Sequence, residues 1–98
     1  MPRFYLHICN GTGFTEDEEG TELADVEAAR RKAIDGLRDI MATEMRRGEI
    51  NMGSFIEIED EQHQLVATIP FLEAVRVTAE AGQRPDRAPP PDEGAGEQ

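Results

Sequence analysis

The sequence predicts a single α+β domain in which one long helix packs on one face of a three- or four-stranded, mainly antiparallel sheet. Three observations predict this fold: a strand-like alternation near the N-terminus, a long stretch of apolar residues at helical spacing, and two later strand-like runs joined by a polar turn. A chain of 98 residues is too short for two hydrophobic cores, so we expect one compact domain over residues 1–79.

The first strand is expected at residues 3–9, where side chains alternate between the two faces of a strand. One face carries Phe4, Leu6 and Ile8, and the other carries Tyr5, His7 and Cys9. Both faces are bulky, which favours a central or covered strand. The Asn-Gly-Thr-Gly sequence that follows is typical of a tight turn. If residues 14–15 pair with the first strand, the sheet gains a fourth strand at its edge.

The acidic run at residues 16–19 predicts an exposed loop or an edge strand, because the carboxylates repel one another. The long helix is expected at about residues 25–47, with Asp25 as its N-cap and Gly48 as its C-cap. Gly36 within it costs about 1 kcal/mol relative to alanine, which indicates either local flexibility or close packing at this position. The apolar stripe of the helix comprises Ala29, Ala33, Leu37 and Ile40, widened by Ile34, Met41 and Met45.

Residues 55–59 and 64–69 are typical of two strands that form a β-hairpin around the polar turn at 60–63. Pro70 ends the second strand and starts a short C-terminal helix. A right-handed crossover through the long helix predicts that strands 3–9 and 55–59 run parallel, with the last strand antiparallel between them. The sheet residues expected in the core are Phe4, Leu6, Ile8, Ile56, Ile58, Leu65, Ala67 and Ile69.

The long helix is expected to extend past the sheet, because 22 helical residues measure about 33 Å and a seven-residue strand about 23 Å. Its last turns must be covered by the short helix and the loop before the hairpin, or by a second copy of the chain. This overhang is the candidate interaction surface. Its residues are Met41, Met45, Met52, Phe71 and Leu72.

Residues 80–98 are predicted to form a disordered tail, because they are rich in proline, glycine and acids and lack large apolar side chains. The whole chain has 21 acidic and 10 basic residues, and its net charge of -11 disfavours nucleic-acid binding. We find no signal peptide and no apolar run that could span a membrane. A single cysteine excludes an internal disulfide. We therefore expect a cytoplasmic protein.

The weak candidates for a metal site are His7 and Cys9, which share a strand face, together with His63 in the hairpin turn. Their spacing matches no zinc motif, so a half-buried strand histidine and a small apolar cysteine are the preferred interpretation. Nucleophilic chemistry at Cys9 requires an oriented base and a lowered thiol pKa, for which the sequence offers no source. We predict no catalytic residue, metal or cofactor, and hence no enzyme. Cation binding by residues 16–22 stays open, although they lack an EF-hand pattern.

The long helix is the one basic element of the sequence, with Arg30, Arg31 and Arg38 on its candidate basic face. Acids stand at helical spacing from these bases, as in Glu27 with Arg31 and Asp35 with Arg38. No aromatic residues interleave with the bases to stack on nucleotides. A salt-bridged solvent face is therefore preferred over a nucleic-acid interface.

Three motifs occur along the chain in a specific order. They are Pro2-Arg3-Phe4-Tyr5-Leu6-His7, then Asp17-Glu18-Glu19-Gly20-Thr21-Glu22-Leu23 with Asp25-Val26-Glu27-Ala28-Ala29-Arg30, and finally Ile69-Pro70-Phe71. Across residues 2–75 this order resembles a family of small proteobacterial proteins known only as a domain of unknown function, number 6894. The resemblance implies a bacterial cytosolic protein with one compact domain and brings no established activity.

At the level of fold, the chain is also similar to HicB-type antitoxins. In both, a strand is followed by an acidic loop that contains glycine and by a helix that opens with Asp-x-Glu-Ala, here at Gly20 and at Asp25, Glu27 and Ala28. We find no DNA-binding helix-turn-helix segment in this sequence, which disfavours a repressor role.

The leading hypothesis for function is a non-enzymatic protein-interaction or regulatory module with an unidentified protein partner, and a homodimer is a further option. The alternative is a small ligand- or metal-binding protein that uses the uncovered sheet face. The residues available there are Tyr5, His7, Cys9 and Glu57. The third hypothesis is nucleic-acid binding by the basic face of the helix.

Overall fold

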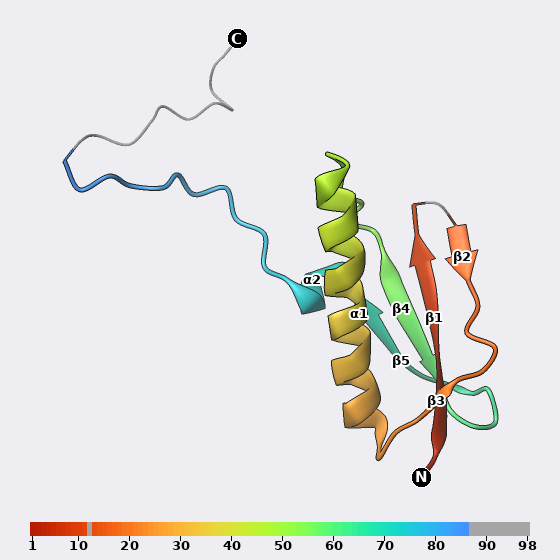
Figure 1. The fold of residues 1–98 in the computed structure, drawn as a ribbon. Coiled ribbons are helices and arrows are strands. Elements are labelled where there is room, and N and C mark those ends of the chain that lie inside the picture. The colour runs from red at the N-terminus through yellow and green to blue at the C-terminus, as the bar shows by residue number, and fades with distance from the viewer. Residues whose placement is uncertain (12, 87–98) are drawn as a thin grey trace.

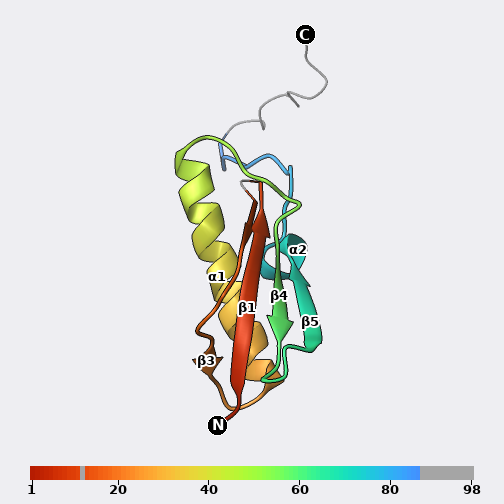
Figure 2. The same ribbon diagram turned by 90° about the vertical axis from the view of Figure 1, so that its right-hand side faces the viewer.

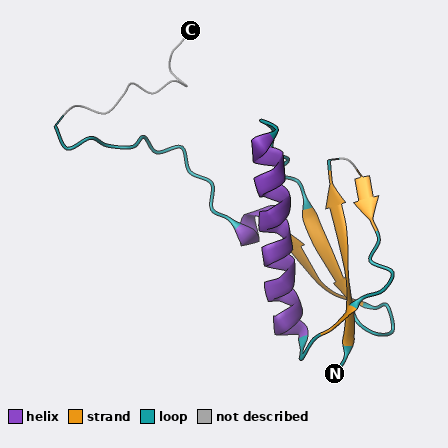
Figure 3. Ribbon diagram, in the orientation of Figure 1, coloured by secondary structure: helices purple, strands orange, loops and turns teal. Residues whose placement is uncertain are grey.

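The computed structural model describes residues 1–11 and 13–86, and it confirms the predicted α+β fold (Figure 1). Within these residues, five strands form one antiparallel sheet, and a long helix covers one of its faces. In chain order the elements are β1 (Arg3–Asn10), β2 (Gly13–Thr15), β3 (Thr21–Glu22), α1 (Val26–Arg46), β4 (Phe55–Glu59), β5 (Leu65–Pro70) and α2 (Phe71–Ala74). Both helices lie on the same side of the sheet, as the secondary-structure colours in Figure 3 show.

The strand order is β2-β1-β4-β5, and β3 also pairs with β1. Phe14 lies opposite Cys9 and Thr15 opposite Ile8, which confirms the predicted edge strand. The predicted parallel arrangement is wrong, because β1 and β4 are antiparallel neighbours and β5 lies beyond β4 rather than between them. The direction of β4 is reversed because the chain first returns along β2 and β3 to the end of the sheet where β1 begins. From there α1 runs alongside β1, and β4 runs back (Figure 2).

Local signals at both ends of α1 act as predicted. The Asp25 side chain accepts a hydrogen bond from the Ala28 N–H at 2.9 Å, which satisfies a backbone donor in the first turn. At the other end, Gly48 adopts a φ of 86° and donates to the Met45 carbonyl, while the Glu49 N–H donates to the Glu44 carbonyl. These two bonds form a Schellman motif, so the cap residues define where the helix ends.

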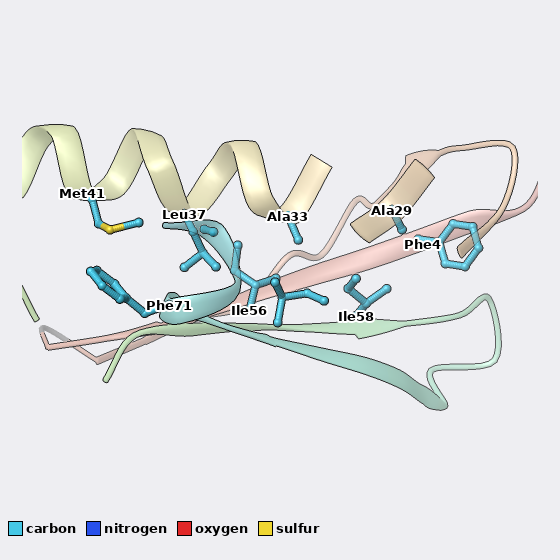
Figure 4. Close-up of a cluster of buried hydrophobic side chains, with 10 residues drawn as sticks. Phe4, Ala29, Ala33, Leu37, Met41, Ile56, Ile58 and Phe71 are labelled. Carbon is cyan, nitrogen blue, oxygen red and sulfur yellow. The ribbon is translucent and has the colours of Figure 1, made fainter. Parts of the chain in front are cut away.

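The core lies between α1 and the sheet, where apolar side chains of both layers interdigitate (Figure 4). On the helix, Met41 rather than Ile40 continues the buried line of Ala29, Ala33 and Leu37, because steps of four residues keep to one side of α1. The other buried hydrophobic residues are Phe4, Ile56, Ile58, Ile69, Phe71 and Ala74. Leu6, Ile8, Ile34 and Ala67 are partly buried against them.

Leu65 was predicted to lie in the core, and this prediction is wrong. A β-bulge shifts the register between Ile58 and Glu59, so that Ala67 lies opposite Ile58 and Leu65 lies opposite Glu59. Because the bulge adds one residue, Val66, the side chain of Leu65 moves to the other face of the sheet. It is 59% exposed there.

The interaction surface predicted at the end of α1 is partly covered, because its five residues differ widely in burial. Met41 and Phe71 pack together within the core, so α2 covers this part of the helix (Figure 4). Met45, Met52 and Leu72 are exposed. Only these three residues of the predicted interaction surface are therefore accessible.

The predicted tail is described in part. Residues 80–86 are exposed, whereas residues 87–98 lie outside the described residues. The domain boundary at residue 79 stays a prediction. Across residues 1–11 and 13–86, no helix has both the length and the apolar character that crossing a membrane requires.

Replacing Gly36 with alanine is expected to raise the free energy of unfolding by about 0.5–1 kcal/mol, since alanine has the higher helix propensity. An added Cβ would lie 3.5 Å from the Ile56 Cδ1 atom, which is an ordinary van der Waals contact. Urea unfolding measures the change. The matched control is Ala42→Gly on the exposed side of α1, for which we expect a loss of about 1 kcal/mol. A destabilised Gly36→Ala variant would contradict the prediction.

Candidate functional site: the open face of the sheet

The sheet face that points away from α1 is here called the open face. Tyr5, His7 and Cys9 lie on it as predicted, because their neighbours Phe4, Leu6 and Ile8 face the helix. Pairing with β4 adds Glu59 opposite Tyr5 and Glu57 opposite His7. The open face therefore gathers the polar and titratable side chains of the two central strands.

His7 is the most buried polar side chain on this face, with 3% of its surface exposed. Its Nδ1 atom accepts a hydrogen bond from the Asp17 N–H at 3.0 Å, and its Nε2 atom lies 3.0 Å from the Glu59 Oε1 atom. A neutral imidazole has one donor and one acceptor, so the bond from Asp17 assigns the proton to Nε2. Both ring nitrogens are thus used within the protein.

Asp17 holds residues 16–20, here called the acidic segment, against the edge of β1. Its Oδ2 atom accepts from the Leu6 N–H at 3.1 Å, and its Oδ1 atom accepts from the Gly20 N–H at 3.0 Å. Where β2 and β3 leave a gap in the pairing with β1, this carboxylate therefore satisfies the β1 backbone donor. The ring of Phe14 lies 5.7 Å from that of His7. The acidic segment is consequently part of the site.

Glu59 connects His7 to the hairpin turn. Its Oε1 atom accepts a second hydrogen bond from His63 Nδ1 at 3.1 Å, and the His63 ring stacks on Tyr5 with the ring centres 4.4 Å apart. The bond from His7, then that from His63, lowers the pKa of the Glu59 carboxyl group below its usual range. The "histidine–glutamate network" comprises Asp17, His7, Glu59, His63 and Tyr5.

The lowered pKa of Glu59 predicts a pH dependence of stability. A carboxyl group whose pKa is lowered on folding stabilises the fold above its unfolded pKa, about 4.3, and loses that contribution as pH falls through the folded pKa. Glu59→Gln keeps an acceptor for His7 but removes the titration. The difference in unfolding free energy between wild type and this variant should shrink as pH falls below about 4.3.

Urea unfolding at pH 7, 5, 4 and 3 measures that difference. Glu61→Gln is the matched control, because Glu61 is an exposed acid two residues further on and lies outside the network. Its difference from wild type should be small and nearly independent of pH. Equal pH dependence in the two variants would show that the network does not lower the pKa of Glu59.

Cys9 takes no part in the histidine–glutamate network. Its side chain is half-buried, and burial, followed by the negative charge of Glu57, raises the pKa of its thiol. A thiol with a raised pKa has little of the thiolate form that nucleophilic attack and metal binding need. These surroundings do not favour covalent chemistry at Cys9.

The structure brings two of the three weak metal candidates together, since His7 and His63 both bind Glu59. Their arrangement is that of hydrogen-bonded side chains rather than of ligands, because the nitrogens of His7 already have partners. Within the part of the chain that the structure describes, no group of three or more histidine, cysteine, aspartate or glutamate residues is arranged to hold a metal ion.

The candidate basic face of α1 serves largely to hold α2. Arg30 forms an ion pair with Glu73, and the Arg38 Nε atom donates to the Ala74 carbonyl at 2.8 Å. Arg31 is exposed. Two of the three guanidinium groups thus bind within the domain, which leaves this face with less positive charge to attract a phosphate backbone.

A pocket lies beyond the open face, at the C-terminal end of α1. It is lined by Gly11, Glu44, Arg47, Glu49, Ile50 and Asn51. The Glu44 carboxylate accepts from the Asn51 N–H at 3.0 Å and so fixes the loop that leads to β4. The sequence did not predict this pocket, because its residues belong to a helix end, a loop and a turn that no shared periodicity connects.

By its fold and its open face, the chain is a small α+β protein whose sheet is covered by helices on one face and carries a histidine–carboxylate network on the other. The chain belongs to the family described as "Domain of unknown function (DUF6894)", whose model matches residues 3–73. The match runs from β1 into α2, so it includes the whole network. The family predicted from the order of motifs is therefore confirmed. No curated protein and no solved structure matches the chain.

Proposed function

We propose that this protein is a non-enzymatic interaction module that binds a partner protein through the open face and the outer edge of its sheet. The observation that carries the proposal is the one-sided cover of the sheet, since both described helices pack on the same face (Figure 3). Away from the helices, Phe14 is 58% and Leu65 59% exposed. A partner that covers the open face would remove these two apolar side chains from water.

The histidine–glutamate network supports binding rather than chemistry. Its members satisfy one another, so they hold Tyr5, His63 and the acidic segment in place before any partner arrives. A surface that is ordered in advance loses less conformational entropy on binding. The alternative, a small-molecule or metal site on the same face, has less support, because His7 has no free nitrogen and the pKa of Cys9 is raised.

The setting that we propose is the cytoplasm of a bacterium, in agreement with the resemblance of the sequence to small proteobacterial proteins. Similarity to HicB-type antitoxins stays a prediction about fold. A homodimer through Met45, Met52 and Leu72 is the alternative form of the interaction hypothesis, since these apolar side chains are exposed.

Site-specific photo-crosslinking in the native cells tests the proposal. A photoreactive amino acid placed at Phe14 or Thr68 should give adducts of a defined mass, because both positions lie on the uncovered side of the sheet. Lys32 and Asp39, which are exposed on α1, are the matched controls and should give none. Adducts at the helix positions alone, or at no position, would overturn the proposal.

A further inference from the structure

We infer that the outer edge of β5 binds a basic, extended segment of the partner protein as an added strand; this inference rests on the proposed function. In the described part of the chain, β5 pairs with β4 on one side and with no strand on the other. An unpaired edge presents backbone donors and acceptors that another strand can use.

The hydrogen-bonding phase of the hairpin shows which groups of β5 point outward. Phe71 donates its N–H to the Ser54 carbonyl at 3.0 Å, and these two residues continue the register of the Phe55–Pro70 pair, so they occupy a hydrogen-bonded position of the β4–β5 ladder. Bonded and non-bonded pairs alternate along antiparallel strands. Ile69 and Ala67 therefore bond to β4, whereas Thr68 directs both its N–H and its C=O to the outer edge.

Two further observations agree with this phase. Pro70, which has no N–H, occupies a position where the β4–β5 ladder needs none. On the opposite side of the sheet, the Leu6 N–H donates to Asp17 and therefore points away from β4. Leu6 lies opposite Ile58, so the backbone groups of Ile58 must face β5, where they meet Ala67. The outward direction of the Thr68 groups thus follows from both sides of β4.

The side chains of β5 leave its edge open to a partner. Natural edge strands are commonly protected by lysine or by an interior proline, and β5 has no lysine and has proline at its last position only. Leu65 is 59% and Val66 39% exposed at its start, beside the bulge. An added strand would cover these two apolar side chains while it bonds to Thr68.

The negative charge of the β4–β5 hairpin favours one kind of added strand. Residues 55–70 contain four acids and neither lysine nor arginine, and one of the acids, Glu57, lies opposite Thr68. A second copy of this chain would bring the same acids and a net charge of -11 to the interface. A basic segment meets these carboxylates favourably, so a partner with lysine or arginine at alternate positions suits the edge better than a self-pairing dimer does.

Synthetic ten-residue peptides test this inference on the full chain. The probe alternates valine or threonine with lysine. One control replaces the lysines with glutamate, and the other keeps the charge but carries two central prolines that prevent strand pairing. Fluorescence anisotropy should show that the probe binds at least tenfold more tightly than either control. Hydrogen exchange of the Thr68 amide, fast in the free protein, should slow in the complex.

Charge-swap variants at one exposed position complete the test. Thr68→Lys should weaken probe binding about tenfold relative to Thr68→Glu, because a lysine at position 68 repels the lysines of the probe and a glutamate attracts them. Equal affinities for the three peptides, equal affinities of the two variants, or crosslinks between Thr68 positions of two copies would overturn the inference. Partner adducts at Phe14 without probe binding would overturn it while leaving the proposed function in place.

Discussion

His7→Ala is expected to lower the free energy of unfolding by about 3 kcal/mol, because two groups lose a hydrogen-bond partner beneath the acidic segment. The Asp17 N–H loses its acceptor and the Glu59 carboxylate loses one of its two donors. The variant also removes a buried ring from beneath Phe14. We expect the acidic segment to detach locally, with faster hydrogen exchange at the amides of Asp17 and Gly20.

Urea unfolding together with hydrogen exchange measures both effects. The matched control is His63→Asn, which removes the other donor to Glu59 at an exposed position. Asparagine tolerates the positive φ of 62° at this position, so we expect a loss below about 1 kcal/mol. Similar losses in the two variants would show that burial and the bond to Asp17 do not set the importance of His7.

Elements whose signals are local could be predicted from the sequence. Asp25 and Gly48 act within a few residues of themselves, so the helix observed at Val26–Arg46 lies close to the predicted 25–47. The hairpin follows for the same reason, since Asp60 accepts from both Gln62 and Gln64 within its own turn.

Features that depend on distant pairing could not be predicted in the same way. The direction of β4 is set by the short strands β2 and β3, which are too polar to show a strand alternation. The exposure of Leu65 is set by a bulge, and the adjacent apolar residues Leu65 and Val66 fit either phase of the strand equally well. A single extra residue in the ladder decides between the two phases.

The site shows the same division between near and distant partners. The sequence placed Tyr5, His7 and Cys9 on one strand face, because alternation is a local property. It did not predict that Asp17 and Glu59 bind His7 from positions 10 and 52 residues away. The expected half-buried histidine is buried, since these two partners satisfy both ring nitrogens. Asp17 belongs to the acidic run at residues 16–19, and nothing else in the sequence indicates that it contacts His7.

Gly20→Ala is expected to destabilise the protein by about 3 kcal/mol, through backbone strain and a steric clash together. Gly20 has a φ of 72°, a conformation that residues with a Cβ rarely adopt. An added Cβ would lie 2.9 Å from the Phe4 carbonyl oxygen, from Arg3 Cγ and from Tyr5 Cε1. Relief requires the acidic segment to move away from β1, which disrupts the bond between the Gly20 N–H and Asp17.

Gly48→Ala separates these two contributions. Gly48 also has a positive φ, 86°, but an added Cβ there meets no atom within 4 Å. It should therefore lose only the cost of the left-handed conformation, about 1–2 kcal/mol, in the same urea titration. The excess loss in Gly20→Ala then measures the close contact with β1. If the two variants lose the same stability, the acidic segment is held less tightly against β1 than the hydrogen bonds of Asp17 imply.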